Sequence, residues 1–269
     1  MVSTESAVEA KSPEEISLMR EGGLIVGQVL HILSRAVTPG VSTAELDRIA
    51  EAEIRHRGAK PAFLNYRGYP ATLCSSVNSE VVHGIPRKDK VLREGDIISL
   101  DLGCVLRGYY ADAAITVPVG NISERSRDLV EVARASLARA VEQMWPGKRI
   151  GDISNAVQKF VEDRGYSVVR EFVGHGIGRA LHEAPAVPNY GKAGSGMRLS
   201  VGMVLAVEPM VTMRKPEVRV LADGWTAVTV DGSWAAHFEH TIAITEGGPQ
   251  ILTAYSGEDP GPASGQRSS

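Results

Sequence analysis

The chain has 269 residues, of which 43% are hydrophobic and 23% charged, which is typical of a globular protein with a full core. The net charge of −3 gives no sign of a surface for nucleic acid or another polyanion. No segment approaches 18 uninterrupted apolar residues, and two cysteines cannot form a disulfide framework. We therefore expect a cytoplasmic protein without a membrane span.

The first 40 residues predict a tail and one long helix. Residues 1–11 are polar and lack the order of a signal peptide, so we expect a flexible tail. Ser12 then caps a helix that continues to about Val37, with Glu15 completing a capping box. Pro39-Gly40 ends this helix.

A second helix and a hairpin are expected next. The capping box Ser42–Glu45 opens a helix that stops at Gly58, and residues 61–82 are expected to form loop and short strand. Asp96–Val119 alternates as a hairpin does, with its turn near Leu106–Gly108.

The second half repeats this order. Ser123 opens a helix to about Met144, Asp152–Asp163 is helical, and four strands should follow, around Val168–Val173, Met203–Val207, Thr226–Val230 and His237–Thr245. Residues 256–269 have too little apolar surface to fold and are expected to be a disordered tail.

An internal repeat explains this order. Residues 92–101 align without a gap with residues 199–208, and the same shift of 107 residues takes Pro39-Gly40 to Pro146-Gly147. We interpret this as a duplicated unit in a single α+β domain, residues 12–255, with helices backing a curved antiparallel sheet about a pseudo-twofold axis. The repeated acids Asp101 and Glu208 should meet near that axis, where they repel unless a cation lies between them.

Four acids and three histidines are candidates for chemistry. If the hairpin turn centres between Leu106 and Arg107, Asp101 and Asp112 lie directly opposite each other on one face. Glu208 and Glu239 each lie at the end or the start of an apolar strand, where a buried acid needs a partner. The candidates are Asp101, Asp112, Glu208, Glu239, the glycine-flanked His175, His182 and His83, whereas His31, His56 and His237 fit a structural role better.

Such an oxygen-rich set suits Mn, Fe, Co or Zn in a two-metal centre, not a closed structural zinc site, which would need cysteines. Paired metals generate a hydroxide nucleophile and hold a carbonyl or phosphoryl oxygen. The sequence contains no G-x-S-x-G elbow, Walker loop or H-E-x-x-H motif.

Seven motifs occur in a specific order and spacing: Tyr66-Arg67-Gly68-Tyr69-Pro70, Val81–Pro86, Asp101-Leu102-Gly103, Gly174–Arg179, His182–Pro185, Val207–Met210 and Phe238–Thr241. Through these motifs the chain resembles the bacterial type I methionine aminopeptidases from about Ser12 to Ala254. That family has the pita-bread fold, a duplicated α+β unit around a dinuclear metal site. The resemblance therefore implies the same architecture as the internal repeat.

The resemblance also implies roles for individual residues. The metal ligands would be Asp101, Asp112, His175, Glu208 and Glu239, holding two divalent ions. A bridging hydroxide would attack the first peptide bond, Glu208 would take and return the proton, His182 would stabilise the oxyanion, and His83 would face the scissile nitrogen. The substrate pocket would be formed by Phe63, Tyr69, Cys74, His83, His182 and Trp225.

The implied activity is removal of the initiator methionine from nascent proteins and peptides whose second residue is small. The chain itself begins Met1-Val2, so we expect its own methionine to be removed at least in part. Its partners would be N-terminal methionyl peptides and nascent chains. A transient ribosome contact is expected of such an enzyme, although no basic patch supports it, and we expect a monomer that binds neither nucleic acid nor membrane.

The sequence departs from the family's common residues at several positions near the expected site. Phe63, Asn65 and Leu181 differ from common residues of the family at the pocket rim, which bears on fine specificity. Ala113-Ala114 replaces hydroxyl residues that would support Asp112.

The same five ligands would serve a pita-bread Xaa-Pro peptidase, which usually carries an extra N-terminal domain. A non-catalytic pita-bread binding module is a third reading, which loss of ligands would mark.

Overall fold

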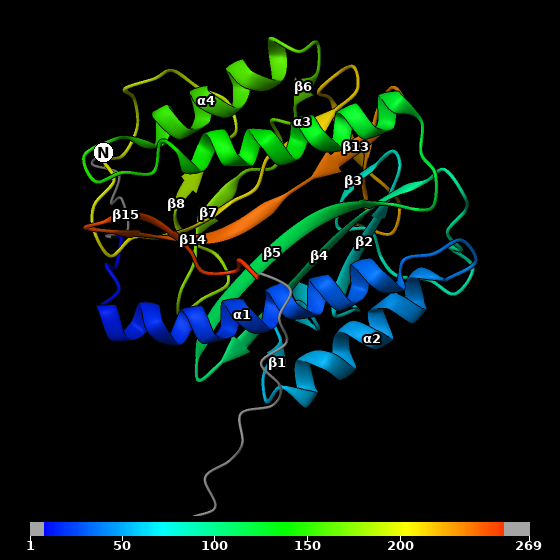
Figure 1. Ribbon diagram of the computed structural model, residues 1–269, viewed down its shortest axis with the longest axis horizontal. Helices are drawn as coiled ribbons and strands as arrows, with labels where there is room; N and C mark the ends of the chain where they lie inside the picture. The colour runs from blue at the N-terminus through cyan, green and yellow to red at the C-terminus, as the bar shows by residue number, and fades with distance from the viewer. Residues whose placement is uncertain (1–7, 256–269) are drawn as a thin grey trace, which may run out of the picture.

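The computed structural model describes residues 8–255, in which a curved sheet is flanked by two pairs of helices (Figure 1). Helices α1 (Pro13–Ala36) and α2 (Thr43–His56) lie along one half of the sheet. Helices α3 (Glu124–Val141) and α4 (Ile150–Glu162) lie along the other half. A short 3-10 helix, η1 (Tyr66–Gly68), lies between β1 and β2 of the first half.

The main sheet is antiparallel and has the strand order β1-β4-β5-β14-β9-β7-β8, with β2 paired to β4 and β15 paired to β14. Two small sheets, β13-β10-β6 and β11-β12-β3, complete the described part. The strands are β1 (Lys60–Pro61), β2 (Leu73–Val77), β3 (Glu80–Val82), β4 (Ile97–Leu106), β5 (Tyr109–Pro118), β6 (Ser167–Val168), β7 (Gly174–Gly176), β8 (Glu183–Val187), β9 (Val204–Val207), β10 (Met210–Thr212), β11 (Val218–Val220), β12 (Ala227–Thr229), β13 (Ala235–His237), β14 (Glu239–Thr245) and β15 (Gly248–Ile251). The expected α+β architecture is confirmed.

Three of the four predicted helix starts are confirmed by their caps, whereas α4 begins at Ile150, two residues before the expected Asp152. Ser12 Oγ accepts a hydrogen bond from the Glu15 amide, and the Glu15 carboxylate accepts one from the Ser12 amide. Ser42 Oγ accepts a hydrogen bond from the Glu45 amide at the start of α2, and Ser123 caps α3. These contacts satisfy amide groups that the first helical turn leaves without partners.

The two halves repeat each other in backbone detail. The isolated bridge between Ser42 and Val91 has a counterpart, shifted by the same 107 residues, between Arg149 and Arg198. Turn glycines with matching left-handed φ angles occur at Gly40 and Gly147 (95° and 92°), Gly58 and Gly165 (both 77°), and Gly95 and Gly202 (92° and 90°). Glycine tolerates this conformation without a steric penalty. The duplication inferred from the sequence is confirmed.

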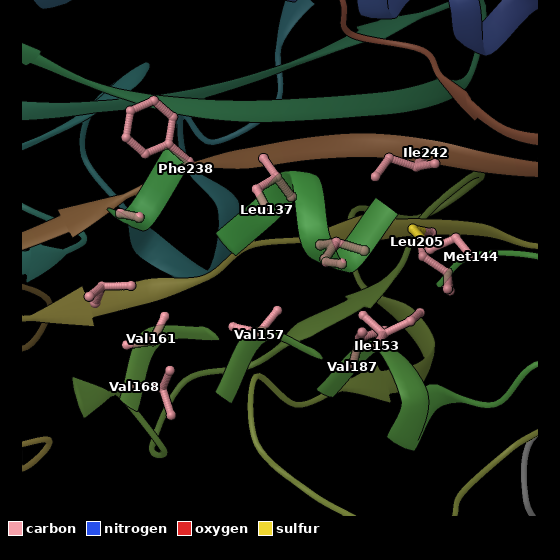
Figure 2. Close-up of a cluster of buried hydrophobic side chains, with 14 of the residues drawn as sticks. Leu137, Met144, Ile153, Val157, Val161, Val168, Val187, Leu205, Phe238 and Ile242 are labelled. Carbon is pink, nitrogen blue, oxygen red and sulfur yellow. The ribbon is translucent and has the colours of Figure 1, made fainter. Parts of the chain in front are cut away.

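Each helix pair covers its own apolar core. Figure 2 shows the second of these cores, where Leu137 of α3 and Val157 of α4 face Leu205 of β9 and Ile242 of β14. The first core lies between α1, α2 and the strands of the hairpin β4–β5. Burial of this apolar surface fixes the central strands on which the candidate site stands.

Helix α1 is long and apolar enough to cross a membrane by length and composition, with a mean hydropathy of 1.2 over its best window. In the structure its side chains Val26, Val29 and Leu33 are completely buried and belong to the first core. This is the packing of a core helix.

The hairpin register corrects one sequence expectation. The turn is centred between Arg107 and Gly108, both with positive φ, one residue later than assumed. Asp101 therefore pairs with Ala114, and Asp112 pairs with Gly103. The two acids share a face of the sheet but are diagonal neighbours, not directly opposite, because moving the turn centre by one residue shifts the register by two.

A second correction concerns the strand expected at Val168–Val173. Only β6 and, after a gap, β7 are strands here, because the chain leaves the sheet at the exposed residues Arg170 and Glu171. Of the two expected tails, residues 1–7 and 256–269 lie outside the described residues. Within the described part, Val8 packs against the second core and the side chain of Lys11 is buried.

Candidate metal centre and substrate pocket

Every predicted ligand, catalytic residue and substrate-pocket residue lines one cavity of about 170 Å³, whereas Asn65, expected at its rim, does not line it. It is lined by Phe63, Tyr66, Arg67, Tyr69, Cys74, His83, Asp101, Asp112, His175, Leu181, His182, Glu208, Trp225 and Glu239. Carboxylates and aromatic side chains both contribute to this lining. Their roles remain predictions, but the structure brings all of these residues together.

The candidate ligands come from five adjacent strands of the main sheet. In the order β4-β5-β14-β9-β7, these strands supply Asp101, Asp112, Glu239, Glu208 and His175, with Glu208 directly after β9. Antiparallel neighbours bring same-face side chains within reach of each other. The sheet therefore collects on one face the acids that the sequence spreads over more than half of the chain.

The distances within this cluster suit a cation. One ligand atom from each of Asp112, His175 and Glu239 lies within 4.8 Å of the others. His175 Nε2 lies 3.7 Å from oxygens of both Asp112 and Glu208, while its Nδ1 lies 2.9 Å from the Gly176 carbonyl. A carbonyl only accepts, so Nδ1 donates and Nε2 offers its lone pair to the cluster. Asp101 Oδ1 is buried and has no hydrogen-bond partner among the described residues.

Burial makes this cluster electrostatically costly. Burial, followed by repulsion from neighbouring acids, raises the pKa of Asp101 to about 8. Burial likewise raises the pKa of Glu208 to about 8, and those of Asp112 and Glu239 are raised for the same reason. The four carboxyl groups repel one another when they are all ionised. A cation bound among them would remove this repulsion and stabilise them as anions. The donor set of four carboxylates and one imidazole fits a divalent ion.

Asp112 has a neighbour that the sequence did not predict. Thr241 Oγ1, from β14, accepts a hydrogen bond from the Asp112 amide and lies 3.1 Å from Asp112 Oδ1. This hydroxyl supplies the support that Ala113-Ala114 cannot give. Its position in the motif around Glu239 was the available sequence signal.

Two histidines border the cavity in neutral form. Burial lowers the pKa of both His83 and His182 to about 4. His83 has a positive φ of 60° and packs edge-on against Phe172, with ring centroids 5.3 Å apart. Tyr66 OH lies 2.9 Å from His182 Nδ1. A neutral imidazole can donate from one nitrogen and accept at the other, as an acyl-transfer site needs.

Another part of the cavity wall is apolar and aromatic. The rings of Tyr69 and Trp225 meet edge to face at 5.1 Å, and the buried Cys74 lies beside them. Asp223 Oδ1 accepts a hydrogen bond from the amide of Trp225 at 2.9 Å and fixes the loop that carries the indole. Such a wall suits a flexible apolar side chain, including a thioether.

The sequence analysis did not predict every residue at the cavity. Tyr66 and Arg67 line the cavity, and both lay within a motif that the resemblance singled out. His237, expected to be structural, is buried, and its Nε2 lies 3.6 Å from Glu208 Oε2. Neither of its ring nitrogens has a hydrogen-bond partner within residues 8–255.

Comparisons with known proteins show which family the chain resembles over most of its length. The model of metallopeptidase family M24 matches residues 17–246. Methionine aminopeptidase 1 of Bacillus subtilis is 52% identical over 243 residues, which cover 90% of this chain and 98% of that protein. The solved methionine aminopeptidase of Thermotoga maritima has a TM-score of 0.91 and 47% identity, covering 93% of this chain and all of that one. The prolidase of Pyrococcus furiosus has the same fold at a TM-score of 0.74 and 25% identity, but this chain covers only 65% of it.

Proposed function

The chain belongs to the methionine aminopeptidases of metallopeptidase family M24, and from this premise we propose how its site selects and cleaves its substrate. The fold is the pita-bread fold, and the chain is an enzyme that uses divalent metal. The proposal is that it removes the N-terminal methionine from nascent proteins and peptides whose second residue is small. The observation that carries it is the cavity itself, which is lined both by the carboxylate cluster and by apolar aromatic side chains.

Two divalent ions, of Co, Mn, Fe or Zn, would be held by Asp101, Asp112, His175, Glu208 and Glu239. When bound, they would polarise the scissile carbonyl and supply an activated water at neutral pH. The support from this chain is the set of raised carboxyl pKa values and the partnerless Asp101 Oδ1 among the described residues, which calls for a cationic partner.

The protein's own side chains would then handle protons and orientation. The Glu208 carboxylate, held as an anion by the bound ions, would accept the proton of the attacking water and return it to the leaving amine. His182 would donate a hydrogen bond to the developing oxyanion, and His83 would face the scissile nitrogen. Both imidazoles are neutral near pH 7, so neither repels the positively charged ammonium group of the substrate.

The aromatic wall would select the first side chain. Tyr69, Cys74, Trp225 and Phe63 would enclose the methionine side chain, whose thioether favours contact with aromatic rings. A narrow space beyond the scissile bond would admit only a small second residue such as glycine, alanine, serine or valine.

Cleavage of two peptides tests the proposal. Protein stripped with a chelator is assayed on Met-Ala-Ser and on Ala-Pro-Ala, before and after addition of Co or Mn. We expect metal-dependent release of methionine from the first peptide only. Cleavage of the second alone would assign an Xaa-Pro peptidase, and inactivity on both without bound metal would leave a binding module. A further series with Gly, Ala, Val, Leu and Phe in the second position tests the size limit.

We also propose the oligomeric state, location and partners of the enzyme. We expect the protein to act as a monomer on nascent chains in the cytoplasm, with transient ribosome contact. Mass spectrometry of the natively expressed chain checks its own processing. Complete retention of Met1 before Val2 would contradict the expected preference for small second residues.

A further inference from the structure

A buried lysine joins the N-terminal segment to the loop that carries His182. The side chain of Lys11 is only 1% exposed, and its ammonium lies 3.0 Å from Glu183 Oε2 and 3.2 Å from the Glu9 carbonyl. Glu183 directly follows His182 and is itself 21% exposed. A lysine this deeply buried must be paired, and the carboxylate of Glu183 supplies the charge.

Lys11 packs so closely against two glycines that neither position has room for a side chain. A Cβ atom on Gly178 would lie 2.2 Å from the Lys11 stem, and one on Gly202 would lie 2.9 Å from the Lys11 carbonyl. The Lys11 amide also donates to the Gly202 carbonyl at 2.7 Å. The absence of side chains at Gly178 and Gly202 therefore lets the segment around Lys11 pack directly against the loop that carries His182.

Glu183 transmits this contact to the loop. Its second oxygen, Oε1, accepts a hydrogen bond from the Ala180 amide at 3.0 Å, so one carboxylate joins Lys11 to the backbone on the other side of His182. The His182 side chain extends into the cavity, where it meets Tyr66 and lies with its ring centroid 4.2 Å from that of His175. The Glu183 carboxylate thus closes the turn that presents His182.

A second ion pair reaches the same loop from α1. Arg179 donates to Glu15 Oε1 at 2.7 Å and lies over the ring of Tyr109. Arg179 is 57% exposed, so this pair is screened by water and salt. The buried contact of Lys11 is therefore the one expected to determine the geometry of the loop.

We propose that Lys11 is a positioning residue for His182, acting through the Glu183 carboxylate. The proposal rests on the proposed function, in which His182 stabilises the oxyanion. Without the ammonium, the Glu183 carboxylate remains partly buried and unpaired. It then turns toward water, releases the Ala180 amide and lets His182 leave the position from which it donates.

Three variants test this coupling: Lys11→Met, Glu183→Gln and the double variant. Lys11→Met keeps the length of the stem, and we expect it to lower kcat on Met-Ala-Ser roughly ten- to a hundredfold with little change in KM, since small displacements cost much in rate. The double variant should recover most of this loss, because the neutral amide introduced by Glu183→Gln needs no cation and its oxygen can still accept from Ala180. Lys159→Met, which removes an exposed ion pair on α4, is the matched control and should leave kcat unchanged.

A second readout does not require activity. In histidine-labelled protein, the ring-nitrogen NMR signals of His182, assigned by their loss in His182→Gln, should shift in Lys11→Met and return in the double variant. Unchanged signals together with unchanged kcat per folded molecule would overturn the proposal, even if the melting temperature falls. A double variant less active than Lys11→Met would overturn it too. If the unsubstituted protein cleaves no methionyl peptide, the proposed function fails, whereas the NMR series still decides the coupling.

Discussion

The phenol oxygen of Tyr66 lies 2.9 Å from Nδ1 of His182, and the two rings stack with centroids 5.4 Å apart. Burial lowers the pKa of His182 to about 4, so the imidazole is neutral near pH 7. If the tyrosine hydroxyl donates to Nδ1, the hydrogen of the imidazole resides on Nε2. Nε2 is then the donor available to an oxyanion, and Tyr66 selects the tautomer that the reaction needs.

Replacing Tyr66 by Phe should therefore lower kcat and leave KM almost unchanged. A neutral hydrogen bond contributes about 1 kcal/mol, so we expect a decrease of roughly fivefold in kcat on Met-Ala-Ser. The control is Tyr166→Phe, which removes a hydroxyl bonded to Asp128 outside the cavity. An equal loss in both variants, or a loss confined to KM, would contradict the assignment.

Local chemistry explains why much of the fold was predictable. The caps at Ser12 and Ser42 and the turn glycines at Gly40 and Gly147 act within a few residues, so their signals are readable without tertiary information. The hairpin was also predicted, but its register was not. Register depended on whether Arg107, a residue with a side chain, would adopt positive φ, and the sequence does not decide this.

Contacts between distant segments account for what the sequence missed. Thr241 supports Asp112 from 129 residues away, and His237 borders Glu208 although nothing in its local sequence marks it. The candidate ligands were singled out from the repeat, the hairpin, the acids of the apolar strands and the glycine-flanked histidine, and the resemblance then implied the same five residues. The structure adds that they occupy adjacent strands, so the sheet explains why residues so far apart form one cluster.

Metal removal should make stability depend on pH. The pKa values of Asp101 and Glu208 rise from ordinary values of 3.8 and 4.5 to about 8 on folding, so the folded metal-free protein holds protons that the unfolded chain has lost. The free energy of unfolding must then fall as pH increases from about 4 to about 8. A loss of only about 2 kcal/mol lowers Tm by roughly 4–8 °C in a chain of this size.

Thermal melts of chelated protein at pH 5, 6, 7 and 8 measure this effect, and Mn or Co should restore Tm most strongly at pH 8. Asp101→Asn should flatten the pH profile and weaken the response to metal. Asp163→Asn, at an exposed carboxylate on the surface, should do neither. A Tm of the chelated protein that rises between pH 6 and 8 would sink this prediction.

The glycine after His175 should not tolerate a side chain. A Cβ at Gly176 would lie 2.1 Å from the Ala184 carbonyl, so Gly176→Ala must displace β7 from β8. We expect a loss of roughly 1–3 kcal/mol in the free energy of unfolding and weaker metal binding, because His175 moves with the strand. Gly247→Ala is the control, since its Cβ would meet only Thr245 Oγ1, at 3.8 Å. Denaturant melts and metal titrations check both, and equal behaviour of the two variants would refute the prediction.

The indole of Trp225 should contribute to the choice of methionine. Its ring meets that of Tyr69 at 5.1 Å and that of His83 at 6.3 Å, so it forms the aromatic side of the cavity. Sulfur–aromatic contacts contribute about 0.3–1.5 kcal/mol, which predicts a preference of roughly two- to tenfold for a methionyl over a norleucyl peptide. Trp225→Leu should raise KM for both peptides and reduce this preference, because leucine offers no aromatic ring. Trp145→Leu removes an indole that is 46% exposed outside the cavity, and it should change neither value. Measured kcat/KM ratios decide the matter, and an unchanged ratio in Trp225→Leu would assign the selection of methionine to shape alone.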